Sequence, residues 1–97
     1  MQELSGKWQG ATDGMTYVMT QQGNILFVRG EGLGSQNVGY GIINPQEQSI
    51  VFHWADMPGS AGYGNHGICY LDARNPGHIS KRAGCPQFGI GNFRKIS

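Results

Sequence analysis

The sequence predicts a single all-β domain spanning residues 1–97, and three observations support that prediction. A chain of 97 residues has room for one hydrophobic core. Seventeen of its residues are glycine, and because glycine in a helix costs about 1 kcal/mol relative to alanine, a helical bundle is excluded. Only 13% of the residues are charged and 10% are aromatic, which is not the composition of a disordered chain.

Glycine, proline and asparagine divide the chain into apolar segments spaced about 8–12 residues apart, which is typical of a β-sandwich or barrel. Eight strands are expected, at residues 7–10, 16–21, 25–30, 38–43, 49–56, 64–71, 78–82 and 88–96. Short connections favour sequential antiparallel pairing. Closure of this meander into an up-and-down barrel would remove the exposed sheet edges.

Turn residues justify the strand boundaries in order. Gln22-Gly23-Asn24-Ile25 predicts a two-residue hairpin between the second and third strands. Pro45 ends the fourth strand, and Pro76 lies in the connection 72–77 before the seventh, because proline cannot continue a ladder of backbone hydrogen bonds. Gly39 and Gly41 alternate along the fourth strand, which would let an aromatic ring lie on bare backbone or let the strand coil sharply.

Side-chain alternation predicts which faces are buried. The fifth strand is apolar on both faces, and Leu26 and Val28 make the third strand similar. Because a barrel normally exposes a polar outer face, we expect another subunit to cover this one, in a homodimer or larger assembly. In the last strand the inward set is expected to be Phe88, Ile90, Asn92, Arg94 and Ile96, with Gly89, Gly91, Phe93 and Lys95 outward.

Leu4-Ser5-Gly6-Lys7-Trp8, together with Arg94, resembles the signature of the calycin superfamily, which includes lipocalins, fatty-acid-binding proteins and avidins. The resemblance implies that the Trp8 indole lies across the closed end of the barrel and that Arg94 packs over it. A guanidinium on an indole face gives a cation–π contact, which provides a physical reason for such a pair.

A second resemblance, to short uncharacterised bacterial proteins, rests on the order of the landmarks at residues 23–27, 30–32, 54–58, 88–89 and 93–94. It supports the fold and implies no catalytic residue. The chain lacks most of the polar residues that line the biotin site of avidins.

The net charge and the N-terminal residues limit the expected binding partners and the expected cellular location. A net charge of +1 disfavours nucleic acid and acidic membranes as partners. Residues 1–4 have neither the basic start nor the apolar stretch of a secretory signal, so a soluble cytoplasmic protein is expected.

The sequence predicts neither a dinucleotide-binding site nor a metal site. Residues 62–67 match G-x-G-x-x-G, but a strand rather than a helix is expected to follow, so no dinucleotide cofactor is predicted. No metal site is predicted, because the candidate ligands lack close spacing; they are His53, His66, His78, Cys69 and Cys85. Two free thiols are the simpler expectation for the cysteines, whereas a disulfide requires that they lie on neighbouring strands.

Aromatic and amide side chains are the candidates for function. The residues expected to line the open end of the barrel and to bind a ligand are Tyr17, Tyr40, Trp54, Tyr63, Asn65 and Asn92. Glycine-rich segments 30–37 and 57–62 would frame that mouth. The alternative is that these side chains fill a small core, because eight-stranded barrels are either filled or hold one small ligand.

The function expected from these residues is non-catalytic binding of a small, mostly apolar ligand. A protein-binding or protease-inhibitor module of calycin type, which would use its N-terminal segment, is the alternative. An enzyme ranks last because no pair of titratable residues is placed for proton transfer.

Overall fold

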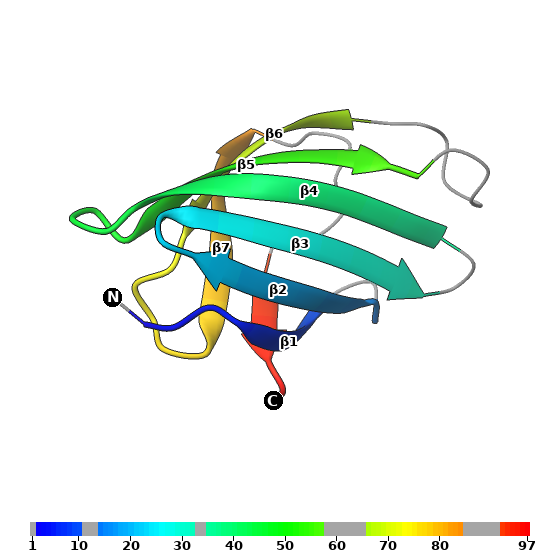
Figure 1. Ribbon diagram of the computed structural model, residues 1–97, viewed down its shortest axis with the longest axis horizontal. Coiled ribbons are helices and arrows are strands. Elements are labelled where there is room, and N and C mark those ends of the chain that lie inside the picture. The colour runs from blue at the N-terminus through cyan, green and yellow to red at the C-terminus, as the bar shows by residue number, and fades with distance from the viewer. Residues whose placement is uncertain (1, 11–13, 33–34, 58–65, 85–91) are drawn as a thin grey trace.

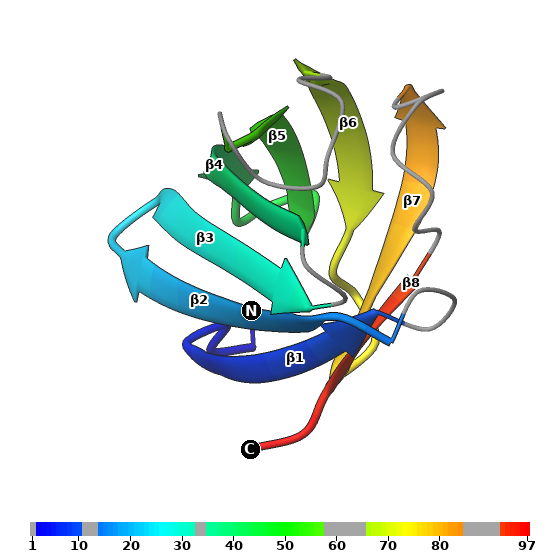
Figure 2. The same cartoon turned by 90° about the vertical axis from the view of Figure 1, so that its right-hand side faces the viewer.

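The computed structural model describes residues 2–10, 14–32, 35–57, 66–84 and 92–97, which form a closed antiparallel barrel (Figures 1 and 2). Its strands follow one another in sequence order, and the expected all-β barrel is thereby confirmed. The strands are β1 (Gly6–Gly10), β2 (Thr16–Gln22), β3 (Ile25–Gly32), β4 (Ser35–Asn44), β5 (Ser49–Asp56), β6 (His66–Asp72), β7 (His78–Gly84) and β8 (Asn92–Lys95). The described residues include no helix that could span a membrane.

The two ends of the barrel differ in their connections. The turns β2–β3, β4–β5 and β6–β7 lie at one end, which the N-terminal residues 2–5 also occupy and which we call the closed end. The connections β1–β2, β3–β4, β5–β6 and β7–β8 lie at the opposite, open end. Each of these four connections includes residues outside the described ranges.

The predicted β2–β3 hairpin is confirmed. Gln22 and Ile25 are the last paired residues, which leaves Gly23 and Asn24 as the two-residue turn. Gly23 has a φ of 59°, in the left-handed region that glycine adopts without steric cost.

The core lies inside the barrel. It contains both tryptophans, Tyr17, Phe52 and Phe93 together with aliphatic and sulfur-containing side chains. Gly39 lies against Phe52, and a Cβ added at Gly39 would come within 2.5 Å of that ring. The expectation that an aromatic ring lies on bare backbone in β4 is therefore confirmed.

In the last strand, β8, the side chains that point into the core are not the set that was expected. Phe93 is buried, whereas Asn92, Arg94 and Ile96 are exposed. The reason is the pairing of β8 with β1, in which Lys95 lies opposite Trp8 and Phe93 lies opposite Gly10. Directly opposed residues share a face of the sheet, so the buried Trp8 turns Phe93 and Lys95 inward. Residues 88–91 lie outside the described ranges.

Cys69 is fully buried and disulfide-bonded, so the expectation of free thiols was wrong. Cys69 lies on β6 opposite Gly84 of β7. Cys85 is the only other cysteine of the chain and lies outside the described residues.

We predict that Cys69→Ser, or reduction of the wild type, lowers the free energy of unfolding by about 3 kcal/mol, the value for a closed loop of about 15 residues. Urea denaturation of the oxidised and reduced wild type at one protein concentration measures the difference. Reductant should not change the stability of Cys69→Ser further. Equal stability of the oxidised and reduced wild type would contradict the structural role of the bond.

Candidate functional site

Trp8 closes one end of the barrel as the resemblance implied, but its cation comes from a different residue. The Trp8 indole is fully buried, and its Nε1 donates a hydrogen bond to the Leu4 carbonyl at 2.9 Å. Lys95 Nζ lies 5.9 Å from the centre of the Trp8 ring and donates to the Glu3 carbonyl at 3.1 Å. Arg94 is exposed on the outer surface, so the expectation that it packs over Trp8 was wrong. Lys95 occupies that position instead.

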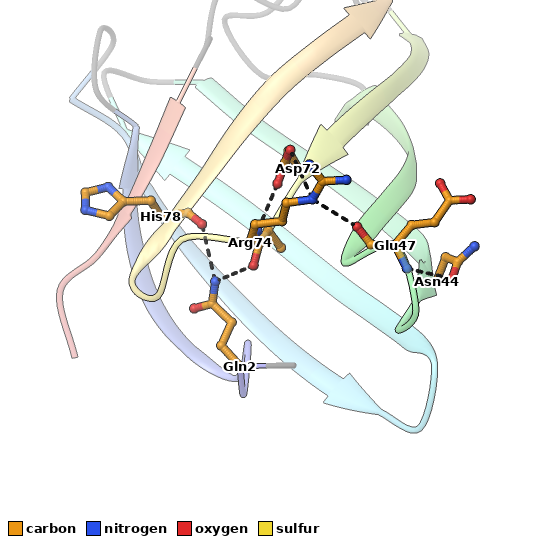
Figure 3. A network of polar contacts seen from close by, with 7 residues as sticks. Gln2, Asn44, Glu47, Asp72, Arg74 and His78 are labelled. Carbon is orange, nitrogen blue, oxygen red and sulfur yellow. Dashed lines mark hydrogen bonds and ion pairs between the residues drawn. The ribbon is translucent and has the colours of Figure 1, made fainter.

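The N-terminal residues 2–5 are fastened across the closed end. The Gln2 side-chain amide donates to the carbonyls of Ala73 and Asn75, both at 2.8 Å, and accepts from the Gly77 backbone N–H at 2.9 Å. It also donates to the His78 carbonyl at 3.4 Å (Figure 3). Leu4 is fully buried, and its backbone N–H donates to Gln21 Oε1 at 3.0 Å. This segment therefore serves as a structural cap on the described barrel.

One carboxylate in this cap is electrostatically perturbed. The Ser5 backbone N–H donates to Glu3 Oε1 at 2.9 Å, and this hydrogen bond lowers the pKa of the Glu3 carboxyl below its ordinary value. The positive charge of Lys95 acts in the same direction. Both groups hold Glu3 in its charged form beside the closed end.

Two of the expected ligand-binding residues, Tyr17 and Trp54, lie inside the barrel. Tyr17 is 1% exposed and meets Phe93 edge to face, with ring centres 5.0 Å apart and planes at 85°. Trp54 is 5% exposed and lies against Gly67. Both rings are thus part of the core, as the filled-barrel alternative expected.

One cavity inside the described part of the barrel is small. The cavity bounded by core side chains has a volume of about 10 Å³; its walls are Met19, Leu26, Val28, Phe52, Leu71, Ile79 and Phe93. A space of this size holds about one water molecule. This part of the interior therefore gives no room for a ligand.

The remaining expected ligand residues are not gathered with Tyr17 and Trp54. Tyr40 projects outward from β4, where it stacks on His53 with ring centres 4.9 Å apart and planes at 12°. Asn92 is exposed on the outer face of β8. Tyr63 and Asn65 lie outside the described residues.

Sequence reasoning missed Asn37, which is buried to 94% on the inner face of β4. A Cβ added at the opposite residue, Gly30, would lie 2.6 Å from Asn37 Oδ1 and would also collide with the Tyr17 ring. The signal was available in the alternation of β4, because Asn37 has the same parity as Gly39 and Gly41, the bare inner face.

A polar groove of about 660 Å³ runs over the outer surface of β1, β8 and β7. We call this feature the polar groove. Its lining residues are Gln9, Gly10, Gly14, Asn75, His78, Ser80, Asn92, Phe93 and Arg94. Asn92 is the one expected ligand residue in this set, and Arg94 is the expected closure residue.

Strand pairing places the polar groups of the groove in two rows. Gln9, Arg94 and His78 follow one another across β1, β8 and β7, and Ser80 lies opposite Asn92 in the next row. Arg94 Nη2 donates to Gln9 Oε1 at 3.2 Å. None of the groove residues in the described ranges is acidic, so Arg94 gives the groove a positive charge.

The histidines do not form a metal centre within the described ranges. No group of three or more His, Cys, Asp or Glu residues there is arranged to hold a metal ion. Comparisons of the chain with known protein families, with curated proteins and with solved structures found no match.

The different positions of Lys95 and Arg94 can be tested by NMR. Lys95→Met should shift the indole N–H resonance of Trp8 and lower the free energy of unfolding by about 0.5–1 kcal/mol, because it removes the cation from the ring. Arg94→Met, the matched control one residue away, should leave that resonance in place. A larger shift for Arg94→Met would restore the arrangement expected from the resemblance.

Proposed function

We propose that this protein is a non-catalytic binder of a small anionic molecule, such as a carboxylate or a phosphate, held in the polar groove. The observation that supports this most is the groove itself, about 660 Å³ in volume and lined by amide, hydroxyl, imidazole and guanidinium groups. Pockets for small molecules are of this size and use a few polar groups to orient the ligand.

The chemistry of Arg94 favours an anion. A guanidinium has five N–H donors in a planar fork, and among the described residues Arg94 Nη2 donates to Gln9 Oε1. Carboxylates and phosphates match this fork with paired, charge-assisted hydrogen bonds. Ser80 and Asn92 lie in the next row of the groove and can donate further hydrogen bonds to the same ligand.

The proposed ligand is polar rather than mostly apolar because of where the space lies. The cavity among the core side chains holds about one water molecule, and Tyr17 and Trp54 are packed into that core. The N-terminal residues 2–5 are fastened by hydrogen bonds of Gln2 and Leu4, so they do not supply the free segment that the protease-inhibitor alternative uses.

Two further elements of the proposal concern ancestry and location. The closed eight-stranded barrel with a buried Trp8 beneath a cation is compatible with a calycin-like origin. The disulfide bond of Cys69 favours an oxidising compartment over the cytoplasm that the N-terminal residues suggested, because cytosolic thiols are kept reduced.

The proposal predicts that titration with inorganic phosphate or acetate shifts the amide resonances of Ser80, Asn92 and Arg94 in a ¹H–¹⁵N spectrum. Arg94→Gln should weaken binding of the shifting anion about 10- to 100-fold, because it removes a charge-assisted contact. Arg82→Gln is the matched control: it removes the same charge from β7, but Arg82 does not line the groove. Shifts outside the groove, or equal effects of the two substitutions, would contradict the proposal.

A further inference from the structure

The outer surface of β2 to β6 carries a set of exposed apolar side chains, which we call the outer apolar face. Each of its members is 36–48% exposed; they are Val18, Ile25, Phe27, Val38, Tyr40, Ile42, Val51, Ile68 and Tyr70. Figure 1 shows β2, β3, β4 and β5 side by side as one broad curved sheet.

Strand register makes this face continuous. One row across β3, β4, β5 and β6 consists of Phe27, Tyr40, His53 and Ile68, each opposite the next. The adjoining row consists of Ile25, Ile42, Val51 and Tyr70. Directly opposed side chains in antiparallel sheets are about 5 Å apart, so both rows are in contact along their length. An antiparallel sheet with one solvated face normally places polar residues there.

The area of the face is that of a protein interface. From the exposed fractions, its nine residues present roughly 700 Å² per copy, taking about 150–220 Å² for a whole side chain. The largest apolar patch of a typical monomer is about 300–600 Å². Each partner in a standard stable interface buries about 800 Å², which the face reaches with its neighbours Thr20 and His53.

The low charge of the outer apolar face indicates which kind of partner it binds. Arg29 and Glu31 are the charged residues on the outer side of β3; Arg29 lies between Val18 and Val38 within the face, and Glu31 lies further toward the open end. A face with so little charge gives no attraction to nucleic acid or to an acidic membrane surface. A second copy of the same face meets no like-charge repulsion in its apolar centre and buries apolar area on both sides.

The shape of the outer apolar face, which has both a hollow and a projection, is suited to self-association. A hollow of about 380 Å³ lies over β2, β3 and β4, among Val18, Thr20, Phe27, Arg29 and Val38. The stacked rings of Tyr40 and His53 lie in the next row beside it. An isologous interface needs a projection and a hollow on the same surface, so that each copy fills the other.

We propose that two copies of this chain pack through the outer apolar face in a two-fold symmetric dimer, with the Tyr40–His53 stack of each copy near the hollow of the other. The polar groove lies on β1, β7 and β8 and shares no residue with this face, so both grooves stay open in the dimer. The dimer and the anion site are therefore independent, and either can fail alone.

Sedimentation velocity of the full chain, from micromolar to millimolar concentration, tests the dimer. We expect a mass of about 21 kDa, twice that of the 10.5 kDa chain. Phe27→Glu should raise the dissociation constant at least 100-fold, because each dimer then buries two unpaired carboxylates. Ile96→Glu, which changes an equally exposed apolar residue beyond β8, should leave the dissociation constant unchanged.

A second measurement keeps the proposal testable if Phe27→Glu does not fold. Dilution of the wild type should move amide resonances of β3, β4 and β5 and leave those of β7 and β8 in place. A wild type that stays monomeric at millimolar concentration would overturn the dimer, as would dilution shifts confined to β7 and β8. A monomer whose β3–β5 resonances move on adding phosphatidylcholine vesicles would overturn it too and would assign the face to a lipid surface.

Discussion

The burial of Trp8 at the closed end determines which way three strands face. β1 pairs with β2 on one side and with β8 on the other, and Trp8 lies opposite Tyr17 and Lys95 in these pairs. Since opposed residues share a face, one buried indole places Tyr17 in the core and Lys95 over the ring. The alternate residue, Arg94, then has to point outward. The polar groove is thus a consequence of the same packing that closes the barrel.

Local features of the sequence predicted most of the fold, whereas features that depend on pairing were missed. The Gly23-Asn24 turn and the strand spacing are local, and both were predicted correctly. The last strand has apolar residues at both parities, so only its pairing with Trp8 decides that Phe93 is inside. The state of Cys69 likewise depends on β6 and β7 being neighbours. The expected ligand residues are not gathered in one place, because Tyr40, Trp54 and Asn92 project to different sides of the barrel.

The small size of the barrel explains why the function proposed here lies on its outside. Bare backbone at Gly30 and Gly39 lets the Tyr17 and Phe52 rings lie directly on neighbouring strands. Because these large rings lie so close to the neighbouring strands, they fill the interior around them. A close-packed core leaves few voids larger than a water molecule. A longer-stranded barrel of the same strand number has room for a ligand, whereas this one uses its interior for stability.

With core side chains packed inside the described part of the barrel, the two proposals give its two sides separate roles. The side formed by β1, β7 and β8 carries polar residues and the charge of Arg94, which keep it hydrated. The side formed by β2 to β6 is apolar on both faces, and in a dimer it becomes a second core between two sheets. Burial of that face in the proposed dimer would stabilise strands whose inner core is small, since a chain of 97 residues has limited apolar area to bury by itself. The proposed association and the proposed ligand binding would then use different surfaces of the same barrel, so that a ligand could enter its groove without opening the dimer.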